Sequence, residues 1–115
     1  MCSFTVTNSK NSLELGNKFS QRRGPDYTEV KKINGVQFLH NLLHITGVKK
    51  IQPFIKDDIV CVFNGEIYNY QEFGAYKSDG ECIIPLYVEY GIDFARKLDG
   101  EFAICIVDFK KSSLI

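Results

Sequence analysis

Residues 63–70 read Phe63-Asn64-Gly65-Glu66-Ile67-Tyr68-Asn69-Tyr70, which places a glycine, an acid and two amides directly after an apolar run. The preceding stretch, Asp57 to Phe63, is an acidic turn followed by β-branched and aromatic side chains, a pattern typical of a strand. Asn64-Gly65 is therefore expected at a strand's end, where the glycine N–H and the asparagine amide offer two donors. Two donors that converge on one point would form an oxyanion hole. A simple tight turn is the alternative interpretation.

A second apolar run, Phe102 to Phe109, is hydrophobic on both strand faces and must be covered on both sides. Together with Ile59 to Phe63 it predicts a sheet inside a layered α/β domain and not a surface meander. Between the two runs, Ser78-Asp79-Gly80-Glu81 is typical of a helix N-terminus. A helix is expected to follow, with Pro85 as a mild conflict and Gly91 as its stop.

The N-terminal part of the chain has weaker patterns. Met1 to Thr7 alternates apolar and polar residues and predicts a short strand. The stretch from Asn8 to Lys32 is mostly polar, and its few apolar residues leave a helix or a loop open. Within it, Arg23-Gly24-Pro25-Asp26 predicts a turn with an arginine available to pair with a carboxylate.

Asn34-Gly35 introduces Val36 to Ile45, which is long enough for one bent strand or two consecutive ones. His40 and His44 could suggest a metal site or a general base. Because residues four apart in a strand share a face only loosely, we expect structural roles for both. At the other end of the chain, Lys110 to Ile115 is expected to form a turn and the opening of a further strand.

The length of 115 residues limits the chain to one domain, residues 1–115, with a single core. The zero formal net charge gives no electrostatic reason to expect nucleic acid or an anionic membrane as a partner. No apolar run approaches the roughly 20 residues that span a bilayer, so a cytoplasmic location is expected. The four cysteines show neither a C-x-x-C pair nor the histidine spacing of a zinc site, so we expect no metal and no cofactor.

Five short motifs occur in one order along the chain: Met1-Cys2-Ser3, Arg23-Gly24-Pro25-Asp26, Asn64-Gly65-Glu66-Ile67-Tyr68-Asn69, Ser78-Asp79-Gly80-Glu81 and Leu98-Asp99-Gly100-Glu101-Phe102-Ala103. Over nearly the whole chain, this series resembles the glutaminase domain of asparagine synthetase and related class II glutamine amidotransferases. The resemblance implies the N-terminal nucleophile hydrolase fold, a layered αββα sandwich of the α+β class. Family members continue past the position of Ile115, so a truncated chain with a minimal or incomplete second half is expected.

In that family an amino-terminal cysteine attacks the side-chain amide of glutamine, releases ammonia and forms a thioester that water resolves to glutamate. Cys2 occupies this position once Met1 is removed. A thiol is a strong nucleophile, and a free α-amine, with a pKa of about 7.7–8.0, is a base near neutral pH. By the same resemblance, Asn64 and Gly65 would bind the oxyanion.

The resemblance also implies that Glu66 and Asp79 hold the α-ammonium group of the substrate, with Arg23 and Asp26 supporting the site. The sequence departs from the family pattern at Leu42. Family members generally have an arginine at this position, which binds the α-carboxylate of the substrate. Losing such a charged hydrogen bond weakens binding by ~10- to 150-fold unless another cation, such as His44 or Arg23, substitutes.

Three functions follow. The first is a cysteine-dependent glutaminase, with glutamine as substrate and a synthetase chain as a possible partner. The second is a weak or inactive homologue that serves as a binding module, assembled with another chain or a second copy. The third is a hydrolase of another amide, which the residue at position 42 suggests. The chain has no P-loop, so ATP-dependent amide synthesis is not expected within it.

Overall fold

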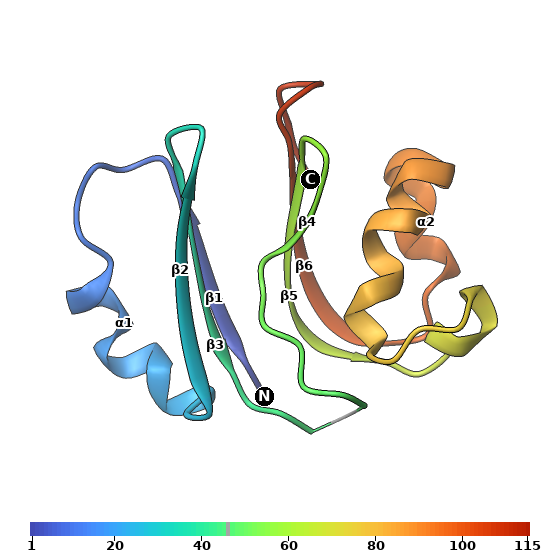
Figure 1. Ribbon diagram of the computed structural model, residues 1–115, viewed down its shortest axis with the longest axis horizontal. Helices are drawn as coiled ribbons and strands as arrows, with labels where there is room; N and C mark the ends of the chain where they lie inside the picture. The colour runs from blue at the N-terminus through green and yellow to red at the C-terminus, as the bar shows by residue number, and fades with distance from the viewer. Residues whose placement is uncertain (46) are drawn as a thin grey trace.

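The computed structural model describes residues 1–45 and 47–115 and confirms the predicted αββα sandwich. Figure 1 shows two antiparallel sheets face to face, with α1 on the outer side of one sheet and α2 on the outer side of the other. The first sheet has the strand order β1-β3-β2 and the second has the order β4-β5-β6-β7.

The elements, in chain order, are β1 (Ser3–Thr7), α1 (Glu14–Ser20), the 3₁₀ helix η1 (Gln21–Arg23), β2 (Tyr27–Ile33), β3 (Val36–Leu42), β4 (Phe54–Lys56), β5 (Ile59–Ile67), the 3₁₀ helices η2 (Tyr70–Phe73) and η3 (Asp79–Cys82), α2 (Ile83–Tyr90), the 3₁₀ helix η4 (Gly91–Lys97), β6 (Gly100–Asp108) and β7 (Ser113–Leu114).

In the first sheet, Asn34-Gly35 is the two-residue turn of a hairpin between β2 and β3. Both turn residues have positive φ, 48° and 81°, and Ile33 pairs directly with Val36. This turn type requires left-handed backbone at both positions, which asparagine and glycine tolerate. Residues 36–45 therefore contain one strand, β3. The strand before the turn, β2, was not predicted, because most of it lies in the mostly polar stretch 8–32.

In the second sheet, β5 and β6 form the longest ladder, with registered pairs from Ile59–Asp108 to Ile67–Gly100. The strand β5 continues through Asn64-Gly65 to Ile67, so the predicted strand end there is wrong, and so is the alternative of a tight turn. Gly65 has φ of +140°, and a Cβ on it would lie 2.0 Å from the backbone oxygen of Glu101. The glycine is therefore needed first for the close approach of the neighbouring strand.

The predicted helix after Ser78 begins with η3 and continues as α2. A carboxylate oxygen of Glu81 accepts the N–H of Ser78 at 2.9 Å, which is one half of a capping box. Pro85 is the third residue of α2, and its missing N–H therefore removes no hydrogen bond to a carbonyl within α2. The proline therefore fits the helix start, and Gly91 ends the helix as predicted.

Two apolar clusters hold the layers together. Between the sheets, Phe38 packs with Val60 and Val62. Between the second sheet and α2, a larger cluster includes Phe63, Ile83 and Tyr87. The doubly apolar strands predicted from the sequence thus face a sheet on one side and a helix on the other.

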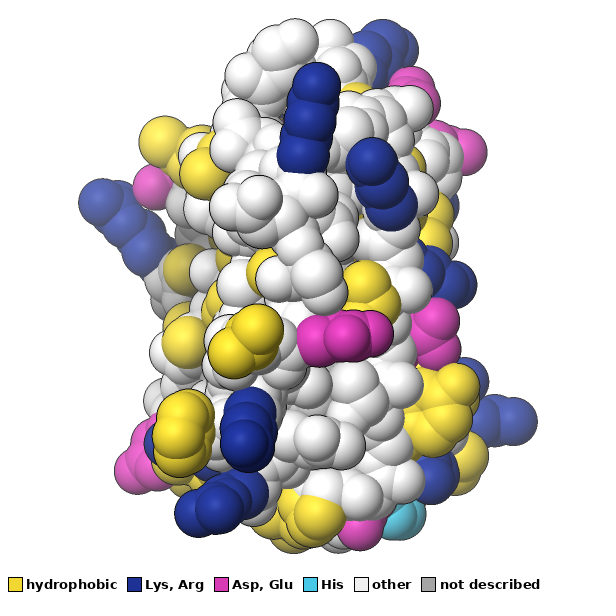
Figure 2. Space-filling view, turned by 90° about the vertical axis from the view of Figure 1, so that its left-hand side faces the viewer, with side chains coloured by type: hydrophobic (Ala, Val, Ile, Leu, Met, Phe, Trp, Pro, Cys, Tyr) yellow, Lys and Arg dark blue, Asp and Glu magenta, His cyan; other side chains and the backbone are white. Residues whose placement is uncertain are grey.

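Figure 2 shows the face of the molecule that α1 and the first sheet present to solvent. Basic, acidic and apolar side chains are interspersed over this face, as expected for a chain with zero net charge. In the residues that the structure describes, no helix is both long enough and apolar enough to cross a membrane.

His40 lies on β3 between the sheets and is 1% exposed, which agrees with the structural role predicted for it. Its Nε2 has no hydrogen-bond partner among the described residues. Burial lowers the pKa of the imidazole to about 4, and the backbone of Phe63 offsets part of that effect. His40 is therefore neutral in the folded protein at neutral pH.

This burial makes stability depend on pH. In the unfolded chain His40 takes up a proton below about pH 6.5, whereas in the folded protein it does so only near pH 4. The contribution of neutral His40 to the free energy of unfolding is therefore fully present above about pH 6.5. It decreases as the pH drops toward 4, with a loss of about 2 kcal/mol at pH 5. Urea unfolding of the wild type and of His40→Gln at pH 7 and pH 5 measures this contribution. An equal pH dependence in the two proteins would contradict it.

Candidate functional site

A cavity of about 280 Å³ opens beside the N-terminal end of β1, and its walls include most of the predicted site residues. Cys2, Gly65, Glu66 and Asp79 all line it. This volume is near the lower end for small-molecule pockets, so the site suits a small metabolite better than a polymer. Asn64 is adjacent in sequence to a lining residue but is not itself one of them.

The thiol of Cys2 is held against the backbone of Leu43. The Leu43 N–H donates to Sγ at 3.3 Å, and Sγ lies 3.5 Å from the Leu43 carbonyl oxygen. By contrast, burial raises the pKa of the Cys82 thiol to about 12 and raises that of Cys105. Cys2 is partly exposed and lines the cavity, whereas Cys82 and Cys105 do not line it.

Strand alternation decides which side chains enter the space between the sheets. On β5, Val60 and Val62 point toward the first sheet, so Asn64 follows them to the same side. On β1, Phe4 points toward the second sheet, and Cys2 continues that alternation. Asn64 and Cys2 thus project into the space between the sheets from opposite walls, and Asn64 Oδ1 is buried without a partner among the described residues.

The backbone N–H of Gly65 points away from β6. The N–H of Tyr68 bonds Asp99 and that of Phe109 bonds Asp58, so even-numbered residues of β5 bond β6 and odd-numbered ones face the other edge. Gly65 is odd-numbered and lines the cavity. Its N–H is therefore directed to the strand edge on the cavity side, where a ligand oxygen could accept it.

The two odd-numbered neighbours of Gly65 are already bonded. The buried Gln52 side chain receives the N–H of Phe63 at 2.7 Å and donates to its carbonyl at 3.0 Å. The N–H of Ile67 donates to Asp79 Oδ2 at 3.0 Å. Gln52 was missed by the sequence reasoning, because it lies just before β4 and reaches Phe63 only once β4 has paired with β5.

Glu66 and Asp79 form an acidic wall of the cavity. Asp79 is 6% exposed, and burial raises the pKa of its carboxyl, as does the negative charge of Glu66, although backbone N–H groups lower it. A cation bound beside both carboxylates would relieve this unfavourable charge. The wall is thus suited to an ammonium group.

The predicted turn at residues 23–26 lies against the chain around Cys2. Arg23 Nε donates to the Cys2 carbonyl at 3.4 Å, and Asp26 accepts the N–H of His44 at 2.8 Å. A Cβ on Gly24 would lie 2.1 Å from the backbone oxygen of Asn41, so the turn packs directly on β3. These contacts connect the turn to the segments that carry the candidate nucleophile.

The sequence profile of the family described as "Glutamine amidotransferase domain" matches residues 1–115. The chain belongs to the glutamine amidotransferase family. Similar proteins include asparagine synthetase [glutamine-hydrolyzing] 1 of Saccharomyces cerevisiae, 37% identical over 117 residues, and asparagine synthetase [glutamine-hydrolyzing] 1 of Arabidopsis thaliana, 36% identical over 115 residues. Asparagine synthetase [glutamine-hydrolyzing] 2 of Bacillus subtilis is 38% identical over 103 residues.

These matches cover 90%, 90% and 80% of this glutamine amidotransferase chain, and 20%, 19% and 14% of the yeast, plant and bacterial proteins, respectively. The chain thus spans a fifth or less of the length of these relatives. The resemblance inferred from the five motifs is confirmed at the level of the family and of the asparagine synthetase type.

The second asparagine of the Asn64–Asn69 motif has a structural position in this domain. Asn69 donates to the carbonyl of Lys97 at 3.0 Å and accepts the N–H of Asp99 at 2.9 Å. It therefore ties the end of β5 to the turn that begins β6. The motif combines cavity residues, Gly65 and Glu66, with one that fixes the adjoining loop.

A second cavity of about 510 Å³ lies at the other end of the sheets, beside Val6, Val36 and Phe109. Its one carboxylate, Asp108, is already bonded by the Tyr87 hydroxyl at 2.9 Å and the Lys111 N–H at 3.1 Å. The cavity that contains Cys2 is therefore the candidate active site.

Proposed function

We propose that this domain hydrolyses the side-chain amide of L-glutamine to L-glutamate and ammonia, with Cys2 as the nucleophile after removal of Met1. The supporting observation is that the Cys2 thiol, the Gly65 backbone and the carboxylates of Glu66 and Asp79 line one cavity. The names of the similar asparagine synthetases include "glutamine-hydrolyzing", which supports glutamine as the substrate.

The chemistry needs a nucleophile, a base and an oxyanion donor. The freed α-amine of Cys2 takes the thiol proton as sulfur attacks the amide carbon, which gives a tetrahedral intermediate with a negatively charged oxygen. The Gly65 N–H and the Asn64 side-chain amide would donate to that oxygen. Transfer of the proton to the leaving nitrogen releases ammonia and leaves a thioester on Cys2. Attack by water then releases glutamate and restores the thiol and amine.

The acidic wall provides a binding site for the α-ammonium group of glutamine. Glu66 and Asp79 both line the cavity, and the negative charge of Glu66 contributes to the raised pKa of the Asp79 carboxyl. An ammonium group between them offsets that repulsion. Arg23 and Asp26 would hold the Cys2 and His44 segments in place for this geometry.

Ammonia formed in the cavity needs an acceptor. The similar relatives are named as asparagine synthetases and are several times longer than this chain. We therefore propose a synthetase region or a synthetase partner chain as the consumer of ammonia. Assembly with a second copy of this chain stays a prediction, as does the cytoplasmic location.

Glutamate release by protein whose N-terminal residue is Cys2 tests this function. Mass spectrometry is expected to show loss of Met1, and the processed protein is expected to release glutamate and ammonia in equal amounts from glutamine. A matched form with one extra residue before Cys2 should be inactive, because an amide nitrogen cannot accept the thiol proton. Equal rates in the two forms, or no release by the processed form, would refute the proposal and favour the binding-module alternative.

A further inference from the structure

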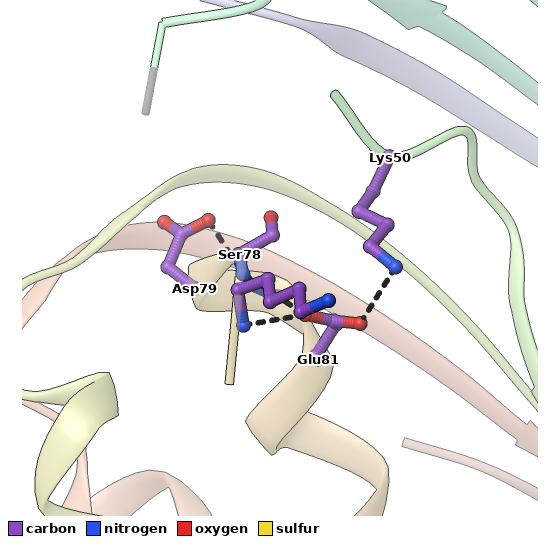
Figure 3. Close-up of polar contacts among 6 residues, drawn as sticks. Lys50, Ser78, Asp79 and Glu81 are labelled. Atoms are coloured by element: carbon purple, nitrogen blue, oxygen red, sulfur yellow. Dashed lines mark hydrogen bonds and ion pairs between the residues drawn. The ribbon is translucent and has the colours of Figure 1, made fainter. Parts of the chain in front are cut away.

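The charges that line the candidate active site are unequal. Glu66, Asp79 and Glu101 contribute carboxylates, whereas Lys50 is the one permanently charged cationic side chain on the cavity wall in the part of the chain that the structure describes. Lys50 comes from the segment between β3 and β4, and Figure 3 shows it reaching toward the start of η3. No local sequence pattern marks Lys50 as a site residue.

Lys50 is held in place by Glu81. Its Nζ lies 3.0 Å from Glu81 Oε1, and the side chain is 38% exposed. The other oxygen, Glu81 Oε2, accepts the N–H groups of Lys77 and Ser78 at 2.9 Å each, so the carboxylate is fixed at the helix start. An ammonium group has three donors, and this ion pair uses one. Lys50 therefore keeps donors and part of its charge available to a ligand.

Opposite charges lie at two sides of Ser78. Figure 3 shows the carboxylate of Asp79 on one side and the ammonium of Lys50, with Glu81, on the other. All three of Lys50, Ser78 and Asp79 line the cavity. A free α-amino acid carries an ammonium and a carboxylate on one carbon, so it needs partners of both signs within one small site. Asp79 and Lys50 are such partners.

Other cationic groups near the cavity are less suited to a carboxylate. The His44 ring nitrogen Nε2 is paired with the Gly47 carbonyl at 2.9 Å. Arg23 is absent from the cavity wall, and its Nε donates to the Cys2 carbonyl. The side chain of Leu42 lines the cavity and has no donor. Lys50 is thus better placed than His44 or Arg23 to replace the arginine that is missing at position 42.

We propose that Lys50, positioned by Glu81, binds the α-carboxylate of the substrate and selects free α-amino acid amides over amides that lack this group. This inference rests on the proposed glutaminase function. It assigns the carboxylate partner to the segment before β4, not to β3.

Steady-state kinetics with two amides test the proposal. The substrates are L-glutamine and 4-aminobutanamide, which is glutamine without its α-carboxylate. Replacing Lys50 with methionine (Lys50→Met) is expected to raise KM for glutamine about 10-fold, with little change in kcat, and to leave kcat/KM for 4-aminobutanamide unchanged. Lys50→Arg should keep KM close to that of the unsubstituted protein.

Lys49→Met is the matched control, because Lys49 is exposed, lies over the Tyr27 ring and does not line the cavity. It should leave both substrates unaffected. Thermal unfolding of each variant verifies that it is folded. If the unsubstituted protein hydrolyses glutamine and Lys50→Met leaves its KM unchanged, the assignment of Lys50 is wrong while the glutaminase function stands.

Calorimetric titration with L-glutamate separates the two proposals when turnover is absent. Glutamate binding that is weakened by Lys50→Met and not by Lys49→Met would support Lys50 and refute only the hydrolytic function. Absence of both turnover and glutamate binding in the unsubstituted protein would refute both.

Discussion

Replacing Cys2 with alanine (Cys2→Ala) is expected to lower the rate of glutamate release by at least ~10⁴-fold, because no other group in the proposed mechanism can form the thioester. The loss should appear in kcat, while glutamate binding measured by calorimetry stays near the unsubstituted value. The alanine lacks only the sulfur, and Cys2 is partly exposed at the edge of the fold, so thermal stability should change little.

Cys105→Ala is the matched control for this experiment. Cys105 lies on β6, packs between the sheets and does not line the cavity. Burial raises the pKa of its thiol, which disfavours the thiolate. The control should keep its turnover with a modest loss of stability. A Cys2→Ala protein as active as this control would remove Cys2 from the mechanism.

Replacing Gly65 with alanine (Gly65→Ala) is expected to destabilise the fold by at least about 3 kcal/mol. A Cβ at this position would lie 2.0 Å from the Glu101 backbone oxygen, and φ of +140° disfavours any L side chain. Relief requires β5 and β6 to separate around the Gly65–Phe102 pair, near the Gly100 end of their ladder. Because a domain of this size has a small margin of stability, urea unfolding should show a large drop in the midpoint or an unfolded protein.

Gly16→Ala provides the same chemical change in open space. Gly16 lies in α1, and a Cβ on it would meet nothing within 4 Å. Alanine is the better helix former, so this control should gain up to about 1 kcal/mol. Equal stabilities of the two variants would show that the β5–β6 contact tolerates a side chain and that the glycine serves only the ligand.

Much of the layered fold could be predicted from local pattern. The strands β5 and β6 could be predicted because both have apolar residues on their two faces, and such strands must be covered on both sides. The capping sequence from Ser78 to Glu81 predicted the start of a helix. The strand β2 was missed because the consecutive residues Val30, Lys31 and Lys32 are all exposed, so no alternation of apolar and polar residues appears. The Asn34-Gly35 turn, which pairs β2 with β3, was the signal that could have revealed it.

The candidate site could be predicted only in part. Residues in one motif, such as Gly65 and Glu66, are neighbours in sequence and so were found together. Lys50 and Gln52 reach the cavity through contacts with residues 31 and 11 positions away, Glu81 and Phe63. Short-range patterns do not contain such pairings, because they depend on how β4 and η3 pack against β5.

The hydrogen bonds at Phe63 and Ile67, on either side of Gly65, also affect whether another chain can add a strand to the free edge of β5. Beyond Cys61 the strand has no β4 residue to pair with, and an open edge of this kind invites another chain to add a strand. The side chains of Gln52 and Asp79 already occupy the peptide groups at Phe63 and Ile67. Among the described residues, the Gly65 N–H is the one donor left open between these two bonded positions, so this edge offers a small molecule a hydrogen bond but gives an incoming strand little to pair with.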